Sequence, residues 1–312
     1  PSSHGRPGPR DPHFTAYLVP FERAFDQVSQ VEMFGRTYDS LVMVTSSQSG
    51  KTDGVLDVIG QRLEQRPVPM LYVGPSKEWF TQSQFEMRLT RMLTTAPGLK
   101  DRTATGKRTK QWRKMVGGVP VGLAWAGSPS QLRGMSAGIA FLDELDAFGP
   151  AALQEGDPFS LLEARGASYR DRIRAAISTP LKGTVDIVID EASGLELWQQ
   201  MPPEDIESPI WRLWQGGTRH HFTWQCPHCA EWFVPRFKCL RWPEGATAAD
   251  AKRKAYVECP RNGCVIEESH KREMNVRGRY VAPGQRIDAD GNVTGDPPDS
   301  TTLSMWASGL CS

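Results

Sequence analysis

The sequence predicts a three-layer α/β/α fold around a mainly parallel sheet, followed by a small β insertion. Apolar runs alternate with helix-like segments over residues 13–210. One of these runs leads into a small-residue loop, and a later one ends in two acidic residues. After about Trp211, paired cysteines and aromatic residues replace the alternation. Strands separated by helices are typical of a parallel sheet that is covered on both faces.

Composition limits the possible classes of protein. The 312 residues, 39% of them hydrophobic, suffice for a large core. The net charge of +1 means that any nucleic acid must be bound by a local basic patch. No apolar run approaches the roughly 20 residues that span a bilayer, and no signal-peptide core is present. The 6 cysteines are too sparse for a disulfide scaffold. We therefore expect a soluble, intracellular protein.

The expected elements and segments follow from these patterns. We expect strands at 41–44, 70–73, 138–142 and 173–177, and a helix at 52–65. Pro and Gly make residues 1–12 an expected flexible N-terminal arm. The expected divisions after it are 13–210 for the α/β domain, 211–282 for the cysteine-containing module, and 283–312 for a linker and terminal segment.

A phosphate-binding loop is expected between the strand at 41–44 and the helix at 52–65. Its residues are Ser46, Ser47, Gln48, Ser49, Gly50, Lys51 and Thr52. Backbone N–H groups and the positive helix end suit phosphate. Lys51 would contact the β- and γ-phosphates of ATP, and the Thr52 hydroxyl would ligate Mg²⁺. Thr45 stands where the usual pattern has its first glycine. The alternative is a polar helix N-terminus capped by Ser and Thr.

Two carboxylates follow the apolar run at 138–142. Asp143 is expected to hold Mg²⁺, and Glu144 to polarise the attacking water. Alternatively, Asp143, Glu144 and Asp146 only cap the next helix.

Hydroxyl residues end the strand expected at 173–177. Ser178 and Thr179 would sense the γ-phosphate or its water and pass the change to a neighbouring loop. An ordinary Ser-Thr-Pro turn explains this segment equally well when it is taken alone.

Four cysteines form two close pairs, Cys226 with Cys229 and Cys259 with Cys264. Two such knuckles can place four thiolates around Zn²⁺ and close a small ribbon that lacks its own core. We expect a structural site, because four protein ligands leave no open position. Buried apolar cysteines are the alternative. Other possible ligands are Cys239, His228, His220 and His221.

Together, the Ser-Ser-Gln-Ser-Gly-Lys-Thr loop, the Phe-Leu-Asp-Glu strand, the Ser-Thr-Pro segment and the paired cysteines resemble large terminase subunits of the lambda-like tailed bacteriophages, from about Pro20 to Leu310. The resemblance implies that these are the Walker A loop, the Walker B strand and the coupling motif of a P-loop ATPase. Lys51 and Thr52 would then bind nucleotide and Mg²⁺, Asp143 would hold the metal, and Glu144 would activate water.

The same resemblance implies a motor that moves double-stranded DNA into a procapsid in the host cytoplasm. Its partners would be the small terminase subunit and the portal, and it would act as a homo-oligomeric ring. Large terminases continue into a nuclease domain, so we expect a fragment in which 283–312 leads to an absent nuclease domain. The parent protein would also be an endonuclease, but no nuclease residue is assigned here.

One departure from the family concerns its charge-stabilising arginine. Many terminases carry that arginine at the position of Ser47. Arg133 is our first candidate for a substitute, because the transition state of phosphoryl transfer needs a cation that stabilises its negative charge. Arg165, Arg170 and Arg172 are the next candidates, and ordinary surface arginines are the alternative.

A basic run is the candidate DNA contact, because basic loops neutralise phosphates without reading sequence. Its members are Arg102, Lys107, Arg108, Lys110, Trp112, Arg113 and Lys114. Lys252, Arg253 and Lys254 form a weaker candidate, and a solvated face is the alternative for both runs.

Two rival functions remain. A helicase-like P-loop ATPase would need a second RecA-like domain, which the chain beyond Trp211 does not resemble. A zinc-ribbon binding module with an inactive P-loop is supported mainly by Thr45.

Overall fold

The computed structural model describes residues 11–106, 110–128, 134–149 and 157–312. Ten of the described strands form one central sheet. Along the sheet lie β10 (Trp232–Phe233), β9 (His220–Gln225), β17 (Thr302–Trp306), β1 (Ser40–Val44), β6 (Ile173–Ser178), β5 (Ile139–Asp143), β2 (Met70–Gly74), β4 (Val119–Trp125) and β3 (Arg113–Val116), and β14 (Arg279–Val281) pairs with β9.

The strands from β9 to β4 pair in parallel, and β3, β10 and β14 are antiparallel additions. The mainly parallel sheet predicted from the sequence is therefore confirmed. Val44 lies opposite Ser178 on one side and Trp306 on the other, and Asp143 lies opposite Ile177. The segments that follow β1, β5 and β6 consequently meet at the carboxyl edge of the sheet.

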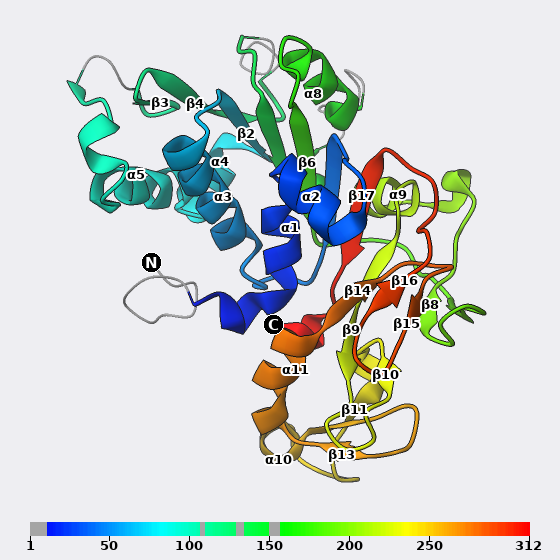
Figure 1. The fold of residues 1–312 in the computed structure, drawn as a ribbon. Coiled ribbons are helices and arrows are strands. Elements are labelled where there is room, and N and C mark those ends of the chain that lie inside the picture. The colour runs from blue at the N-terminus through cyan, green and yellow to red at the C-terminus, as the bar shows by residue number, and fades with distance from the viewer. Residues whose placement is uncertain (1–10, 107–109, 129–133, 150–156) are drawn as a thin grey trace.

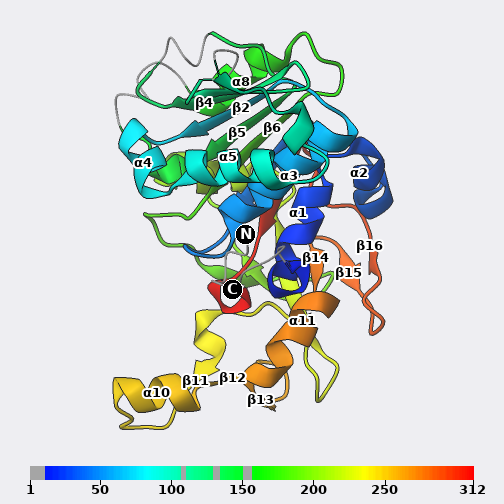
Figure 2. The same cartoon turned by 90° about the vertical axis from the view of Figure 1, so that its left-hand side faces the viewer.

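Helices cover both faces of this sheet (Figures 1 and 2). One face carries α1 (Val19–Arg23), α3 (Lys51–Gln65), α4 (Lys77–Gln82) and α5 (Phe85–Thr95), and the other carries α8 (Pro158–Gly166) and α9 (Pro209–Gln215). Successive residues of β1 enter different cores, Leu41 and Met43 on one face and Val42 and Val44 on the other. Strands buried on both faces are continuously apolar, which is why they could be recognised in the sequence.

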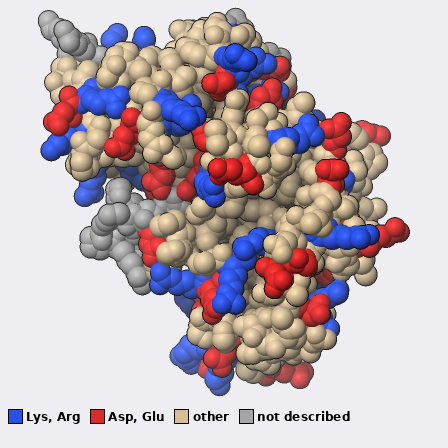
Figure 3. All heavy atoms as spheres, viewed as in Figure 1, with Lys and Arg blue, Asp and Glu red and all other residues tan. Residues whose placement is uncertain are grey.

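The remaining elements border this core. Before the cysteine pairs lie η1 (Pro12–Leu18), α2 (Gln27–Phe34), η2 (Lys100–Arg102), η4 (Leu145–Ala147), β7 (Ile187–Ile189), β8 (Glu196–Trp198) and η5 (Pro203–Asp205). None of the described helices is long and apolar enough to cross a membrane. Basic and acidic side chains are interspersed on the face shown in Figure 3, as the near-zero net charge would suggest.

The region with the paired cysteines lies at one end of the molecule (Figures 1 and 2). It contains η6 (Phe237–Cys239), a small sheet of β11 (Leu240–Arg241), β12 (Tyr256–Glu258) and β13 (Val265–Ile266), α10 (Ala248–Lys254), η7 (Glu268–His270) and α11 (Lys271–Arg277). After it come the hairpin β15 (Arg286–Ile287) and β16 (Val293–Thr294), and η8 (Gly309–Cys311).

The central sheet extends past the boundary expected near residue 211. It takes β9, β10 and β14 from the expected module 211–282, and β17 from the expected terminal segment 283–312. Because β9 begins with two histidines, its sequence lacks the continuous apolar run that is typical of a buried strand. Burial lowers the pKa of His220 to about 3, so this histidine is neutral inside the sheet at neutral pH.

The position of β17 between β9 and β1 generates a test of stability. Leu303 of β17 is 0% exposed, whereas Ile189 of β7 is 68% exposed. We expect Leu303→Ala to lower the free energy of unfolding by about 2–5 kcal/mol, because it leaves a cavity beside β1. Ile189→Ala should change it by less than about 0.5 kcal/mol. Denaturant unfolding measures both, and equal values would place residue 303 outside the core.

Candidate functional site

The loop between β1 and α3 lies at the carboxyl edge of the sheet. Gln48 and Gly50 have φ of 56° and 79°, in the left-handed region. Tyr17 donates from its hydroxyl to the main-chain oxygen of Ser49 at 2.6 Å and so fixes the loop from outside. Among the described residues, the buried hydroxyls of Ser46 and Ser49 have no hydrogen-bond partner, so they are available to a ligand at this loop.

Thr45 continues strand β1 rather than turning the chain. Its N–H donates to the oxygen of Ser178 at 3.3 Å, which extends the pairing of β1 with β6. Thr45 is not among the residues with positive φ. Its backbone therefore does not require a glycine, and the departure from the usual phosphate-loop pattern carries no strain.

Lys51 connects three of the predicted segments. Its side chain is buried, and its ammonium group donates to the main-chain oxygen of Ser46 at 3.0 Å and to Oγ1 of Thr179 at 2.8 Å. The same group lies 3.3 Å from Oε1 of Glu144. The loop, the acidic strand end and the hydroxyl segment thus meet around one cation.

Asp143 is fully buried at the end of β5. Its Oδ2 accepts hydrogen bonds from Thr52 Oγ1 at 3.3 Å and from the Tyr72 hydroxyl, and its Oδ1 accepts from the N–H of Glu144 at 2.9 Å. Burial, followed by the charge of Glu144, raises the pKa of Asp143 to about 6. A cation bound beside Asp143 would offset this cost of ionisation, so Thr52 and Asp143 fit a hydrated divalent metal.

Glu144 adopts an uncommon backbone conformation. Its φ is 55°, in the left-handed region that residues other than glycine rarely occupy. Its N–H donates to the oxygen of Ile177 at 2.8 Å, which holds this turn against β6. The Glu144 side chain makes no cap hydrogen bond to η4 and instead lies beside Lys51. The capping alternative therefore does not describe Glu144.

The arginine candidates lie elsewhere. Arg133 falls outside the described residues. Arg170 and Arg172 come just before the amino end of β6, and the oxygen of Arg165 accepts from Ala137, just before β5. These three therefore lie at the edge of the sheet opposite the phosphate loop. Within one chain, the structure does not bring them to Lys51.

Two residues near the site were not identified from the sequence. Tyr72 lies within the strand expected at 70–73, and its hydroxyl in an apolar run was the available signal. Arg88 of α5 forms an ion pair with Asp53, which directly follows Thr52. The amphipathic pattern of the two helices predicts neither Arg88 nor Asp53 as an ion-pair partner. The pair depends on how α5 packs against α3.

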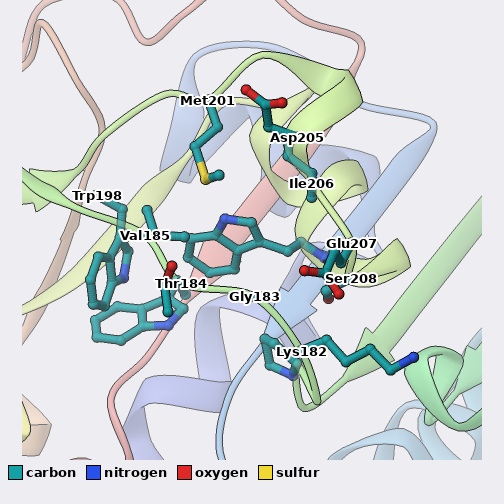
Figure 4. Close-up of a pocket in the computed structure, with 13 residues that line it drawn as sticks. Lys182, Gly183, Thr184, Val185, Trp198, Met201, Asp205, Ile206, Glu207 and Ser208 are labelled. Carbon is teal, nitrogen blue, oxygen red and sulfur yellow. Dashed lines mark hydrogen bonds between the residues drawn. The ribbon is translucent and has the colours of Figure 1, made fainter.

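A pocket of about 220 Å³ begins where the Ser-Thr-Pro segment ends. Figure 4 shows residues 182–185 along one wall and residues 205–208 along the other, with Trp198 and Met201 beside them. Pro180, Trp211 and Trp306 complete the lining. The end of β6 is therefore followed directly by an aromatic pocket.

Three of the four paired cysteines lie in one mutually close group, and the fourth, Cys259, lies beside one of them. The sulfurs of Cys226, Cys229 and Cys264 lie within 4.8 Å of one another, and Cys259 Sγ lies 3.8 Å from Cys229 Sγ. The two knuckles repeat one backbone pattern. The N–H of Ala230 donates to the oxygen of Cys226, and the N–H of Gly263 donates to the oxygen of Cys259.

This donor set fits zinc. Zn–S bonds of about 2.3 Å in a tetrahedron require sulfurs about 3.8 Å apart. Burial raises the pKa of Cys259 to about 12 and that of Cys264 to about 11. Burial also acts on Cys229, but hydrogen bonds from Asn262, Glu231 and neighbouring thiols outweigh it and lower the pKa to about 7. A bound cation would stabilise all four thiolates.

The alternative metal ligands lie outside this cluster. His220 Nδ1 is 2.8 Å from Thr218 Oγ1, and His221 Nε2 accepts from the N–H of Trp198. His228 packs edge-on against His270, and Cys239 is buried in η6. Of the described His, Cys, Asp and Glu residues, Cys226, Cys229 and Cys264 form the group close enough to share a metal.

The basic run is partly structural. Lys107 and Arg108 lie outside the described residues. Lys114 is buried in an ion pair with Glu86, and Trp112 packs edge-on against two other aromatic rings. Exposed basic residues of this run include Lys110 and Arg113. Lys252, Arg253 and Lys254 are all exposed on α10, where Arg253 pairs with Asp250.

Residues 21–280 match the family model of the ATPase domain of the phage terminase large subunit gpA. No curated protein matches. The large terminase ATPase domain of Thermus phage P74-26 is 20% identical with a TM-score of 0.37, and the match covers 50% of this chain and 64% of that one. The large terminase of bacteriophage HK97 is 16% identical with a TM-score of 0.41, over 56% of this chain and 34% of that one. Because the family model spans most of the chain, the chain belongs to the family of phage terminase large subunit ATPase domains.

Proposed function

We propose that this chain hydrolyses ATP at the loop 46–52 and uses the energy to move double-stranded viral DNA into a procapsid. The convergence of Lys51, Asp143 and Glu144 at one sheet edge is the observation that carries the proposal. Membership of the terminase ATPase family supports the same reaction.

Each residue has a role that its contacts support. The Lys51 ammonium group would exchange its bonds to Ser46 and Thr179 for oxygens of the β- and γ-phosphates. Ser47, Gln48, Ser49 and Gly50 would offer backbone N–H groups to the phosphates. Thr52 and Asp143 would hold Mg²⁺, which neutralises phosphate charge when bound.

Glu144 is the proposed general base. Its side chain is 29% exposed, so water can reach it, and its Oε1 lies 3.3 Å from the Lys51 ammonium group. The carboxylate would accept the proton from water while the water oxygen bonds to the γ-phosphorus, and ADP would leave. Thr179, which now accepts from Lys51, and the neighbouring Ser178 would respond to the γ-phosphate.

We propose that the arginine that stabilises the charge of the transition state is Arg133 or comes from a neighbouring copy in a ring. Arg165, Arg170 and Arg172 lie at the opposite edge of their own sheet, so they would act only across an interface between copies.

The small terminase subunit and the portal are proposed partners in the host cytoplasm, and nuclease activity is proposed for a longer parent protein. The segment divisions at residues 12, 210 and 282 stay proposals for the sequence, although the central sheet takes strands from both sides of residues 210 and 282.

We assign Zn²⁺ to the thiols of Cys226, Cys229, Cys259 and Cys264, and the site would be structural. The small sheet β11–β12–β13 buries few side chains, so the metal would hold this region together. Exposed basic residues such as Lys110, Arg113, Lys252 and Lys254 are proposed to contact DNA phosphates.

The ATPase proposal predicts two distinct defects. Glu144→Gln should still bind ATP but lose most turnover, because the base is removed and the phosphate contacts stay. Lys51→Ala should weaken both binding and turnover, because a phosphate-binding cation is lost. The measurement is ATP hydrolysis by the purified chain with and without linear double-stranded DNA, together with ATP binding.

Lys100→Ala is the matched control, since Lys100 is exposed on η2, outside the site. It should behave as wild type. Wild-type turnover by Glu144→Gln would contradict the role of Glu144, and a wild-type chain without turnover or nucleotide binding would indicate an inactive loop.

The zinc assignment predicts metal content and stability. Elemental analysis should find one zinc per chain, and Cys226→Ser or Cys259→Ser should release it and lower the melting temperature, since each removes a ligand. Cys239→Ser is the control, because Cys239 is buried outside the thiol cluster. A purified chain without metal, or equal zinc retention by all three variants, would argue against the site.

A further inference from the structure

Asp146 lies two residues after Glu144, in η4, where three parts of the structure meet. Its Oδ2 accepts from the N–H of Leu181 at 3.0 Å, and its Oδ1 accepts from the N–H of Ile210 at 2.9 Å. Its own N–H donates to Oγ of Ser178 at 3.2 Å. One residue therefore joins η4 to the end of β6, to the loop after β6 and to α9.

The two N–H groups that Asp146 binds flank the aromatic pocket. Leu181 immediately precedes the wall at 182–185, and Ile210 follows the wall at 205–208 within α9 (Figure 4). A single carboxylate thus accepts hydrogen bonds from the backbone beside each of the two pocket walls. This arrangement needs two acceptor oxygens, which a carboxylate supplies and an amide does not.

Helix capping accounts for the bond to Ile210, which is an N–H of the first turn of α9, but not for the bond to Leu181. The N-cap of α9 is Ser208, whose side chain already accepts from the N–H of Trp211. The bond from Asp146 to Ile210 is a further link from a distant part of the chain. Asp146 also binds Leu181, which lies in a loop rather than in a helix.

The other end of this link reaches the nucleotide site. Glu144 donates its N–H to Ile177, and Asp146 donates its N–H to Ser178, so η4 is bound to the end of β6 at two consecutive residues. The next residue, Thr179, accepts from Lys51. Glu144, the proposed general base, and Thr179, the proposed phosphate-sensing residue, both lie beside Lys51. The two hydrogen bonds to the end of β6 hold them in this arrangement.

We propose that Asp146 is a positioning residue for ATP hydrolysis, which fixes Glu144 relative to Thr179 and ties both to the walls of the aromatic pocket. This inference rests on the proposed ATPase function. A change at the γ-phosphate that moves Thr179 would be carried through Asp146 to residues 182–185 and to α9. Both carboxylate oxygens of Asp146 already accept from backbone N–H groups, so Asp146 would act on turnover rather than on ATP affinity.

The test compares Asp146→Asn with Asp205→Asn. The first replaces one acceptor by an NH₂ group that faces a backbone N–H, so one of the two bonds is lost. The second changes an exposed carboxylate of the pocket wall that has no ion pair among the described residues. We expect Asp146→Asn to lower kcat about tenfold or more through misplacement of the base, with the Kd for ATP changed less than about twofold.

Asp205→Asn should match wild type in both quantities. A double variant with Ser178→Ala should lower kcat by less than the product of the two single effects, because Asp146 and Ser178 belong to one link. Thermal unfolding of each variant is measured alongside.

Wild-type kcat in Asp146→Asn would overturn the positioning role and leave the ATPase proposal intact. Loss of ATP affinity and melting temperature in parallel with kcat would reduce Asp146 to a structural residue and would also overturn it. Absence of hydrolysis in the wild-type chain itself would reject the ATPase proposal, and this inference with it.

Discussion

The burial of the Asp143 carboxylate is the constraint on which the rest of the site depends. A buried charge is costly unless it is paired and hydrogen-bonded. The partners of Asp143 come from separate elements, with Thr52 on α3, Tyr72 on β2 and the N–H of Glu144 after β5. These partners meet only if the strands hold their order and register. The order and register of the strands therefore determine both the fold and the polar contacts of Asp143 at this edge.

Polar contacts also connect the loop 46–52 with the thiol region. Tyr17 binds the oxygen of Ser49, and the hydroxyl of Tyr280 on β14 binds the oxygen of Tyr17. On the neighbouring strand β9, the indole of Trp224 donates to Asn275 of α11, shortly before Cys226. A structural metal at the thiols would thus steady β9 and α11, against which the N-terminal segment packs.

The sequence was informative where local pattern and chemistry coincide. The strand that ends at Val44, with Lys51 following, and the strand that ends in Asp143 were predicted because each is apolar on both faces and leads into polar residues. The position of β17 was not, since five residues with Thr and Ser carry little pattern and their place beside β1 is set by long-range pairing. Tyr72 and Asp146 were missed as site residues for the same reason, because their partners are distant in the chain.

The edge formed by β1, β5 and β6 is the proposed site for ATP with Mg²⁺. Calorimetric titration of the wild-type chain with ATP, in the presence of Mg²⁺ and again with a chelator, tests it most directly. We expect one-to-one binding that weakens strongly when Mg²⁺ is removed, because Thr52 and Asp143 would lose the cation they share with the phosphates. Absence of binding in both conditions, or affinity that is independent of Mg²⁺, would contradict it.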